Sequence, residues 1–271
     1  MTVKQNVADL LTNKQGSFLS GEFIARKLGV TRAAVWKSIN SLKADGFDIE
    51  AVNNKGYRLN SEDDTLCVSG INKYLKYADE MRINIFDVLE STNLAVVSKH
   101  AEDEGLVIVA REQTAGLAKN GKHFYSPKDT GIYFSILLKP DFSVETLPVI
   151  SKIAAIAVCR VINSIGCGNA VIENVNDIYY DGHKVCGILS QASILVEESK
   201  IEYAICGIGI NIYPIDISKP DEEHVYCGNI MKTTKGGIKN YLLAETLNCF
   251  WSIYKEMNKN KINAEYLTYK S

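Results

Sequence analysis

The sequence contains no C-x-x-C pair, although seven of its 271 residues are cysteine. An odd number of thiols argues against a disulfide framework and points to a reducing compartment, and the missing spacing argues against a zinc site. The sequence also lacks an uninterrupted apolar run near the roughly 20 residues that span a bilayer. Its first residues do not combine a charged start with a long apolar stretch. We therefore expect a cytoplasmic protein without a metal-ion site in the chain itself and without a membrane partner.

The whole chain has little excess charge of either sign, with a formal net charge of -2, but its first sixty residues and its remainder differ in the sign of their net charge. Residues 1–60 carry nine Lys or Arg against five Asp or Glu, whereas the remainder carries 21 against 27. A chain of this length, with 46% hydrophobic residues, is expected to form two domains. The small basic domain hints at nucleic acid, although such a surplus is also common on a solvated surface.

The first sixty residues show three short helical patterns. The second pattern begins after Ser20, which can accept hydrogen bonds from the first backbone N–H groups, and ends at Gly29. The third begins after Thr31, and its apolar residues Val35, Ile39 and Leu42 recur at helical spacing. Two helices joined by three or four residues that include a glycine have the spacing of a helix-turn-helix.

An expected β-hairpin follows these helices, with strands at 47–52 and 57–59 around the polar turn at 53–56. A hairpin in this place is typical of a wing that lies along DNA. The alternative is a small helical subdomain whose basic residues are merely solvated, but spacing, order and charge together favour DNA. The acidic segment 60–64 predicts the boundary between domains 1–62 and 63–271. The expected DNA-binding residues are Thr31, Arg32, Trp36, Lys37, Lys55 and Arg58.

The remainder of the chain alternates short β-rich runs with a few helices. Helices are expected at 92–103, 146–165 and 238–257. Tight turns are expected at 180–183 and 198–200, which would join the late strands as an antiparallel meander. The predicted fold class is therefore α+β, with a winged helix-turn-helix followed by a mixed α/β domain whose sheet is largely antiparallel. The expected strands are 83–88, 106–110, 131–138, 170–172, 178–180, 185–196 and 201–212.

Two segments of this second domain carry polar and glycine-rich motifs. Ser91-Thr92-Asn93 stands between a strand and a helix, where the hydroxyls and the first helical N–H groups can bind a small polar ring; alone it would be read as a helix cap. Gln113-Thr114-Ala115-Gly116 opens a loop in which backbone N–H groups can approach an acyl or phosphate group. Lys119 and Lys122 follow in the same loop.

Two later segments complete the pattern. Asn176-Asp177 is followed by Lys184-Val185-Cys186-Gly187, and then by Gly207-Ile208-Gly209-Ile210-Asn211. Lys184 alone would be read as a surface lysine beside a hairpin turn. With the earlier motifs and in this order, these segments resemble the biotin protein ligases of the repressor type. The resemblance covers the winged helix and nearly all of the central domain.

The chain departs from the family pattern at several positions. The family loop reads Gly-Arg-Gly-Arg with a further Arg, whereas Leu117 replaces the first arginine here and lysines replace the others, which loses bidentate geometry. Glu173-Asn174-Val175 stands where the family has Lys-Trp-Pro. The chain stops at Ser271, where the family continues into a small β-barrel, so we expect that third domain to be absent.

The resemblance implies a ligase that converts biotin and MgATP to biotinyl-AMP, acylates a carrier-protein lysine, and represses biotin genes as a ligand-promoted dimer on an operator. We expect ligation to be retained but weakened. The alternative is a repressor that senses biotin or a related acid without catalysis. A lipoate-ligase-like activity is a third reading, against which the winged helix speaks. The implied catalytic residue is Lys184. The implied biotin-binding residues are Ser91, Thr92, Asn93, Gln113, Gly116, Lys184 and Gly187, and the nucleotide-binding residues are Lys119, Lys122, Asn176, Asp177 and Asn211.

Overall fold

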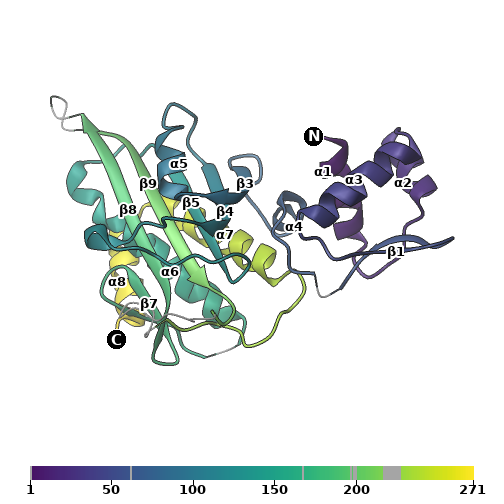
Figure 1. The fold of residues 1–271 in the computed structure, drawn as a ribbon. Helices are drawn as coiled ribbons and strands as arrows, with labels where there is room; N and C mark the ends of the chain where they lie inside the picture. The colour runs from purple at the N-terminus through teal and green to yellow at the C-terminus, as the bar shows by residue number, and fades with distance from the viewer. Residues whose placement is uncertain (1, 62, 167, 196, 198–199, 216–226) are drawn as a thin grey trace. The chain divides into compact units, whose positions relative to one another are not determined.

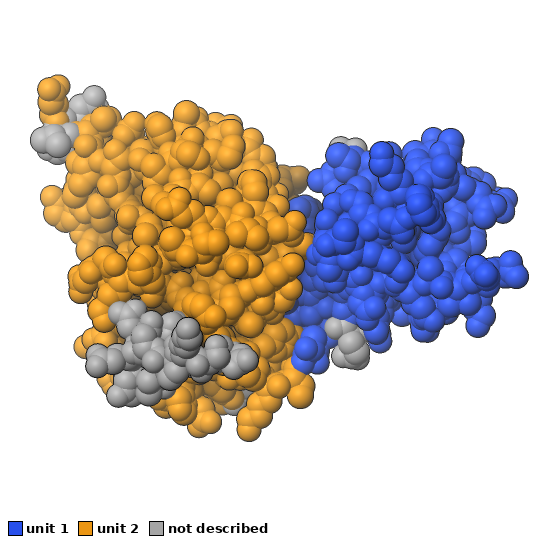
Figure 2. All heavy atoms as spheres, viewed as in Figure 1, with its two compact units in different colours: residues 1–74, 234–241 blue, residues 75–233, 242–271 orange. Residues whose placement is uncertain are grey.

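The chain divides into two compact units in the computed structural model, which describes residues 2–61, 63–166, 168–195, 197, 200–215 and 227–271 (Figure 2). The first unit comprises residues 1–74 and 234–241, and the second comprises 75–233 and 242–271. The first unit therefore includes residues on both sides of the expected boundary at 62. Whether the DNA-binding fold ends there stays a prediction.

The first unit contains the expected helices, and their ends are fixed by local capping. Ser20 Oγ accepts from the backbone N–H of Phe23 at 3.1 Å, and Thr31 Oγ1 accepts from that of Ala34 at 3.2 Å. Gly29 adopts a left-handed φ of 66° and ends the middle helix. The helices are α1 (Val3–Asn13), α2 (Gly21–Leu28), α3 (Arg32–Ala44) and the unpredicted α4 (Val68–Asn72).

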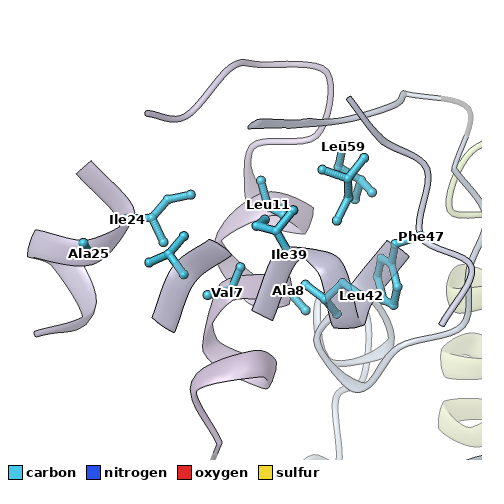
Figure 3. Packing of buried hydrophobic residues seen from close by; sticks show 11 residues of the cluster. Val7, Ala8, Leu11, Ile24, Ala25, Ile39, Leu42, Phe47 and Leu59 are labelled. Carbon is cyan, nitrogen blue, oxygen red and sulfur yellow. The ribbon is translucent and has the colours of Figure 1, made fainter. Parts of the chain in front are cut away.

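One buried apolar cluster joins α1, α2 and α3 to the hairpin (Figure 3). Ile24 of α2 and Val35 and Ile39 of α3 are at most 1% exposed, which explains why the helical spacing was readable from the sequence. Strands β1 (Ile49–Val52) and β2 (Gly56–Leu59) pair antiparallel. A Cβ on Gly56 would lie 2.1 Å from the carbonyl oxygen of Leu19, so only glycine fits where the hairpin meets that segment.

The second unit is built on a seven-stranded sheet with strand order β3-β4-β5-β9-β8-β7-β6 (Figure 1). Only β3 and β4 run parallel, and the other neighbours are antiparallel, which confirms the predicted fold class. The strands are β3 (Arg82–Leu89), β4 (Leu106–Gln113), β5 (Gly131–Leu138), β6 (Val171–Glu173), β7 (Asp177–Tyr180), β8 (His183–Leu195) and β9 (Lys200–Asn211).

Helices cover both faces of this sheet. Helix α5 (Thr92–Val97) contacts β4, β5 and β9, whereas α6 (Pro148–Ser164) contacts β7, β8 and β9 from the other face and carries α8 (Lys259–Tyr269) on its outer side. Helix α7 (Ile238–Glu256) completes the set, with short 3-10 turns at Lys119–Gly121 and Val144–Thr146. None of the described helices is both long enough and apolar enough to cross a membrane.

One expected helix needs correction, and one expected turn lies partly outside the described residues. The helix expected at 92–103 ends at Val97, because the Ser98 hydroxyl and the His100 ring bond to the carbonyl groups of the last turn at 2.8 and 3.0 Å. Helix α8 was not predicted. The 180–183 turn is present, with positive φ at Asp181 and Gly182, whereas Val196 and the Glu198-Ser199 part of the second turn lie outside the described residues.

Candidate functional site

A pocket of about 410 Å³ lies on the sheet face that carries α5. It is formed where the start of α5, the loop after β4 and strands β7, β8 and β9 meet. The predicted residues that line it are Ser91, Thr92, Asn93, Gln113, Lys119, Lys122, Asn176, Asp177, Lys184 and Gly187. Ten residues from four separate sequence motifs thus converge on one cavity, as ligand pockets require.

One end of the pocket is neutral and rich in hydrogen-bonding groups. Among the described residues, Ser91 makes no side-chain cap for α5. Gln113 takes that place, because its Oε1 accepts from the Thr92 backbone N–H at 2.8 Å and lies 3.1 Å from Thr92 Oγ1. The Gln113 amide nitrogen donates to Ser126 Oγ at 2.8 Å, which fixes the orientation of the amide. The Ser91 hydroxyl therefore remains available to the pocket.

Glycines form the floor of this end. Gly187 of β8 and Gly209 of β9 are opposite each other, and a Cβ on either would lie within 3 Å of the Phe124 ring. A Cβ on Gly207 would lie 2.1 Å from Asn93 Oδ1. The Gly-x-Gly motif thus leaves room for two side chains, one amide and one aromatic ring, that rest directly on the sheet.

The loop after β4 folds back as a small hairpin over the pocket. Ala118 N–H donates to Lys122 O at 2.9 Å and Phe124 N–H donates to Gly116 O at 2.8 Å. Asn120 and Gly121 both have positive φ, 58° and 74°, which is the conformation of a type I′ hairpin turn. Gly116 does not line the pocket; it is buried at the base of the hairpin, where a Cβ would lie 2.4 Å from Phe124 O.

The other end of the pocket is cationic. Lys119 and Lys122 are exposed on the hairpin, and Lys184 Nζ pairs with Asp177 Oδ1 at 2.8 Å. Beside them, burial and the carboxylates of Glu173 and Asp177 raise the pKa of Tyr179, so its phenol stays neutral. This end can accept an anionic group that displaces the ion pair.

Glu173 and Asn174, two residues that differ from the family pattern, lie in different surroundings. Asn174, in a left-handed conformation with φ of 48°, lines the pocket, whereas Glu173 is not among its lining residues. Asn176 is buried and its Nδ2 donates to Ile188 O at 2.7 Å, which holds the Asn176-Asp177 turn against β8. Neighbours in sequence thus face different surroundings at this turn.

Asn211 lies at the end of β9, outside the lining of the pocket. It is 2% exposed, and its Oδ1 has no hydrogen-bond partner among the described residues. A buried acceptor without a donor costs roughly 1–3 kcal/mol, so this oxygen is suited to an N–H group of a ligand. Its predicted contact with a nucleotide stays a prediction.

Several residues at the site were missed by sequence reasoning. Phe124 rests on the glycine floor and contacts Tyr133 edge-to-face, with ring centroids 6.3 Å apart. Ser135 of β5 is fully buried beneath α5. A signal for Ser135 existed, since a lone hydroxyl in the apolar run of 131–138 must find a buried partner.

A second candidate site lies on the first unit. A groove of about 690 Å³ is bordered by α3 and by the β1-β2 hairpin, and Arg32 and Trp36 line it. Trp36 is 60% exposed, which is unusual for tryptophan away from an interface. Thr31 is used as the α3 cap, and Lys37 and Lys55 lie outside the groove lining.

Arg58 has partners within the unit. Its Nε donates to Glu50 Oε2 at 3.0 Å, and its guanidinium lies 4.6 Å from the centroid of the Phe18 ring. Lys55 Nζ lies 5.8 Å from the same centroid. The predicted phosphate contact of Arg58 therefore competes with a cross-strand ion pair, and that of Lys55 competes with its contact to the Phe18 ring.

Comparison with known proteins finds a family match in each of the two units. Residues 4–58 match an HTH domain family, and residues 85–211 match the biotin/lipoate A/B protein ligase family. The bifunctional ligase/repressor BirA of Bacillus spizizenii is 34% identical over 224 residues, which are 82% of this chain and 68% of that protein. That of Escherichia coli is 27% identical over 212 residues, which are 78% of this chain and 64% of the relative.

Solved structures show the same fold. The biotin protein ligase of Aquifex aeolicus in complex with biotin and ATP has a TM-score of 0.52 at 23% identity, over 67% of this chain and 73% of that one. With an HTH domain followed by a ligase-type domain and 34% identity to the Bacillus relative, the chain belongs to the family of bifunctional biotin protein ligases and transcriptional repressors.

Proposed function

We propose that this chain condenses biotin with ATP to biotinyl-AMP, transfers biotin to a lysine of a carboxylase carrier protein, and binds an operator DNA as a ligand-promoted dimer. The observation that carries the ligase proposal is the pocket itself. It joins a neutral end, built by Thr92 and Gln113 over a glycine floor, to an end that presents Lys119, Lys122 and Lys184. Such a division fits a ligand with a polar uncharged ring and an anionic tail.

The chemistry places different demands on the two ends. In the first step a carboxylate oxygen of biotin attacks the α-phosphorus of ATP and pyrophosphate leaves; in the second, the carrier amine attacks the acyl carbon and AMP leaves. Both steps build negative charge at the junction of acyl and phosphate groups. Lys184 would stabilise that charge after leaving Asp177, and a preorganised cation in a water-poor site contributes several kcal/mol.

The residues present also fit the magnesium ion that accompanies ATP. Mg²⁺ is usually held by one or two carboxylates together with substrate phosphates and water, not by a protein cage. Asp177 is the carboxylate among the described lining residues, and it would hold the ion once Lys184 turns to the substrate. The bound ion would neutralise phosphate charge. Among the described residues, no cluster of three or more candidate ligands is found, which is compatible with this arrangement.

Within the described residues, no observation favours a sensor that has lost catalysis. The three lysines all line the pocket. Glu173, which stands where the family has a lysine, does not line it, whereas Leu117 does. A cytoplasmic location is part of the proposal, because the substrate carboxylases and the buried free thiols Cys159, Cys186 and Cys206 suit a reducing compartment.

Incubation of the purified chain with biotin, ATP labelled at the α-phosphate and a biotin carrier domain tests the ligase proposal. Labelled biotinyl-AMP should form without carrier, and biotinylated carrier should appear when it is added. Replacing the acceptor lysine of the carrier is the matched control, since it should stop transfer but not adenylation. Binding of biotin without any labelled adenylate would establish the non-catalytic alternative.

The repressor proposal rests on the groove between α3 and the hairpin, where Arg32 and Trp36 are presented together. A two-fold dimer requires an inverted repeat with half-sites matched to its symmetry. Selection of bound duplexes from a random pool should therefore return inverted repeats, and sedimentation should show dimers in the presence of biotin and ATP. Recovery of single half-sites by a monomer would contradict ligand-promoted dimeric repression.

A further inference from the structure

Ser135 is the buried centre of a hydrogen-bonded chain beneath the neutral end of the pocket. It lies on β5, next to Gly207 of β9, and is 0% exposed. Its Oγ is 2.7 Å from Thr92 Oγ1 and 2.6 Å from Asn93 Oδ1. Both partners belong to the start of α5 and both line the pocket, whereas Ser135 does not.

Counting protons decides the direction of these contacts. The Asn93 amide nitrogen donates to Gln191 Oε1 at 2.8 Å and faces Leu189 O at 3.4 Å, so Asn93 Oδ1 must point to Ser135 and can only accept. The Ser135 hydroxyl is the donor in both of its contacts, so its single proton is shared between Asn93 Oδ1 and Thr92 Oγ1. Thr92 Oγ1 accepts in the 2.7 Å contact and donates its own proton to Gln113 Oε1 at 3.1 Å.

The same count fixes what the pocket offers. With its proton directed to Gln113 and one lone pair used by Ser135, the Thr92 hydroxyl keeps a second lone pair for the cavity and acts there as an acceptor. Gln113 is fixed in the opposite sense: Oε1 accepts from the Thr92 backbone, one Nε2 proton goes to Ser126, and Ser126 donates onward to Phe124 O at 2.9 Å. The second Nε2 proton is a donor. The neutral end thus pairs one fixed acceptor with one fixed donor.

We propose that Ser135 is a positioning residue that sets the Thr92 hydroxyl as an acceptor for a ring N–H of the ligand, and so selects acids whose ring carries such a donor. This inference rests on the proposed function, since the cyclic urea of biotin supplies an N–H beside a carbonyl. A sulfur-only ring of a lipoate-like acid supplies neither, so the fixed polarity discriminates between the two classes of acid.

A double-mutant cycle with Thr92 tests the proposal by calorimetric titration of biotin. Ser135→Ala should weaken biotin binding about three- to tenfold, the cost of one misdirected hydrogen bond. Thr92→Val removes the hydroxyl that Ser135 orients. If Ser135 acts through Thr92, then Ser135→Ala added to Thr92→Val should cause no further loss. The KM for ATP should be unchanged by Ser135→Ala, because the cationic end is not involved.

Ser151→Ala is the matched control. Ser151 is a buried serine of the same domain, and its Oγ bonds to Ser190 Oγ at 2.9 Å on the opposite face of the sheet. This variant should lose comparable thermal stability and bind biotin as the wild type does. Should Ser135→Ala fail to fold, the near-isosteric Ser135→Cys gives the same test, because a thiol is a poor donor and acceptor.

The outcomes separate the two proposals. Wild-type protein that does not bind biotin overturns the proposed function and this inference with it. Wild-type binding together with a Ser135→Ala affinity within twofold of it overturns the inference alone. Multiplicative losses in the double variant also overturn it, since they would show that Ser135 acts independently of Thr92.

Discussion

Replacing Lys184 by methionine should separate catalysis from stability. The lysine pairs with Asp177 at 2.8 Å, but the two side chains are 31% and 26% exposed, so the pair is screened by solvent. An ion pair in that setting contributes at most about 1 kcal/mol to folding. A single preorganised group that stabilises transition-state charge contributes about 2.7–4 kcal/mol, which corresponds to about 100- to 1000-fold in rate.

We therefore expect Lys184→Met to lower the rate of biotinyl-AMP formation by about two to three orders of magnitude. Its melting temperature should fall by no more than a few degrees. Pyrophosphate release at saturating biotin and ATP measures the rate, and calorimetry measures the melting temperature. Lys128→Met is the control, because Lys128 is exposed beyond the same loop and does not line the pocket.

Two results would refute the reasoning. An adenylation rate within tenfold of wild type would remove Lys184 from the catalytic role. A rate loss of the expected size that is matched by a melting temperature lowered by 10 °C or more would show that the lysine supports the fold instead. Lys184→Arg should recover only part of the rate, since the guanidinium is wider than the ammonium group and needs a different approach.

Three further predictions follow from other residues. Leu117→Arg should raise adenylation about tenfold, since it adds a cation to the pocket lining, whereas Glu173→Lys alone should change it little; equal effects in a pyrophosphate assay would contradict the geometry. Lys55→Ala should weaken binding to all DNA sequences and lower the slope of log binding constant against log salt concentration by about one. Identical slopes for this variant and the wild type in anisotropy titrations would exclude a wing contact. Burial raises the pKa of the Cys206 thiol from its usual 9.0 to about 12, so the stabilisation it gives is complete below pH 9 and is lost as pH rises toward 12. The melting temperature of Cys206→Ala should therefore fall less steeply than that of the wild type as pH rises from 9 to 12. Equal falls for the two proteins in differential scanning calorimetry would contradict the raised pKa of this thiol.

The helix-turn-helix was predictable because its determinants are local. Ser20 and Thr31 cap the helices that directly follow them, and Gly29 supplies the left-handed residue between them. These features depend on neighbours only three or four positions away. The end of α5 was not predictable, since Ser98 and His100 stop it through side-chain bonds that compete with a pattern otherwise compatible with a longer helix.

The segments that form the pocket were predictable from the sequence, but which of their side chains line the cavity was not. Glu173 and Asn174 are adjacent, yet only the second lines the cavity, because the turn places Asn174 in a left-handed conformation. The importance of Phe124 and Ser135 depends on the register of β5, β8 and β9, which brings distant glycines beside them. Register is set by pairing across the whole sheet, and a single sequence does not display it.

The Asn120-Gly121 turn has a thermodynamic consequence for ligand capture. Loops that order only around a ligand lose conformational entropy at that moment and show the large negative heat-capacity change of coupled folding. Here the hairpin between Gly116 and Phe124 is already closed by backbone hydrogen bonds. Its ordering belongs to the folding of the domain, so the heat-capacity change of binding should scale with the apolar area that the ligand buries, and the binding enthalpy should change little with temperature.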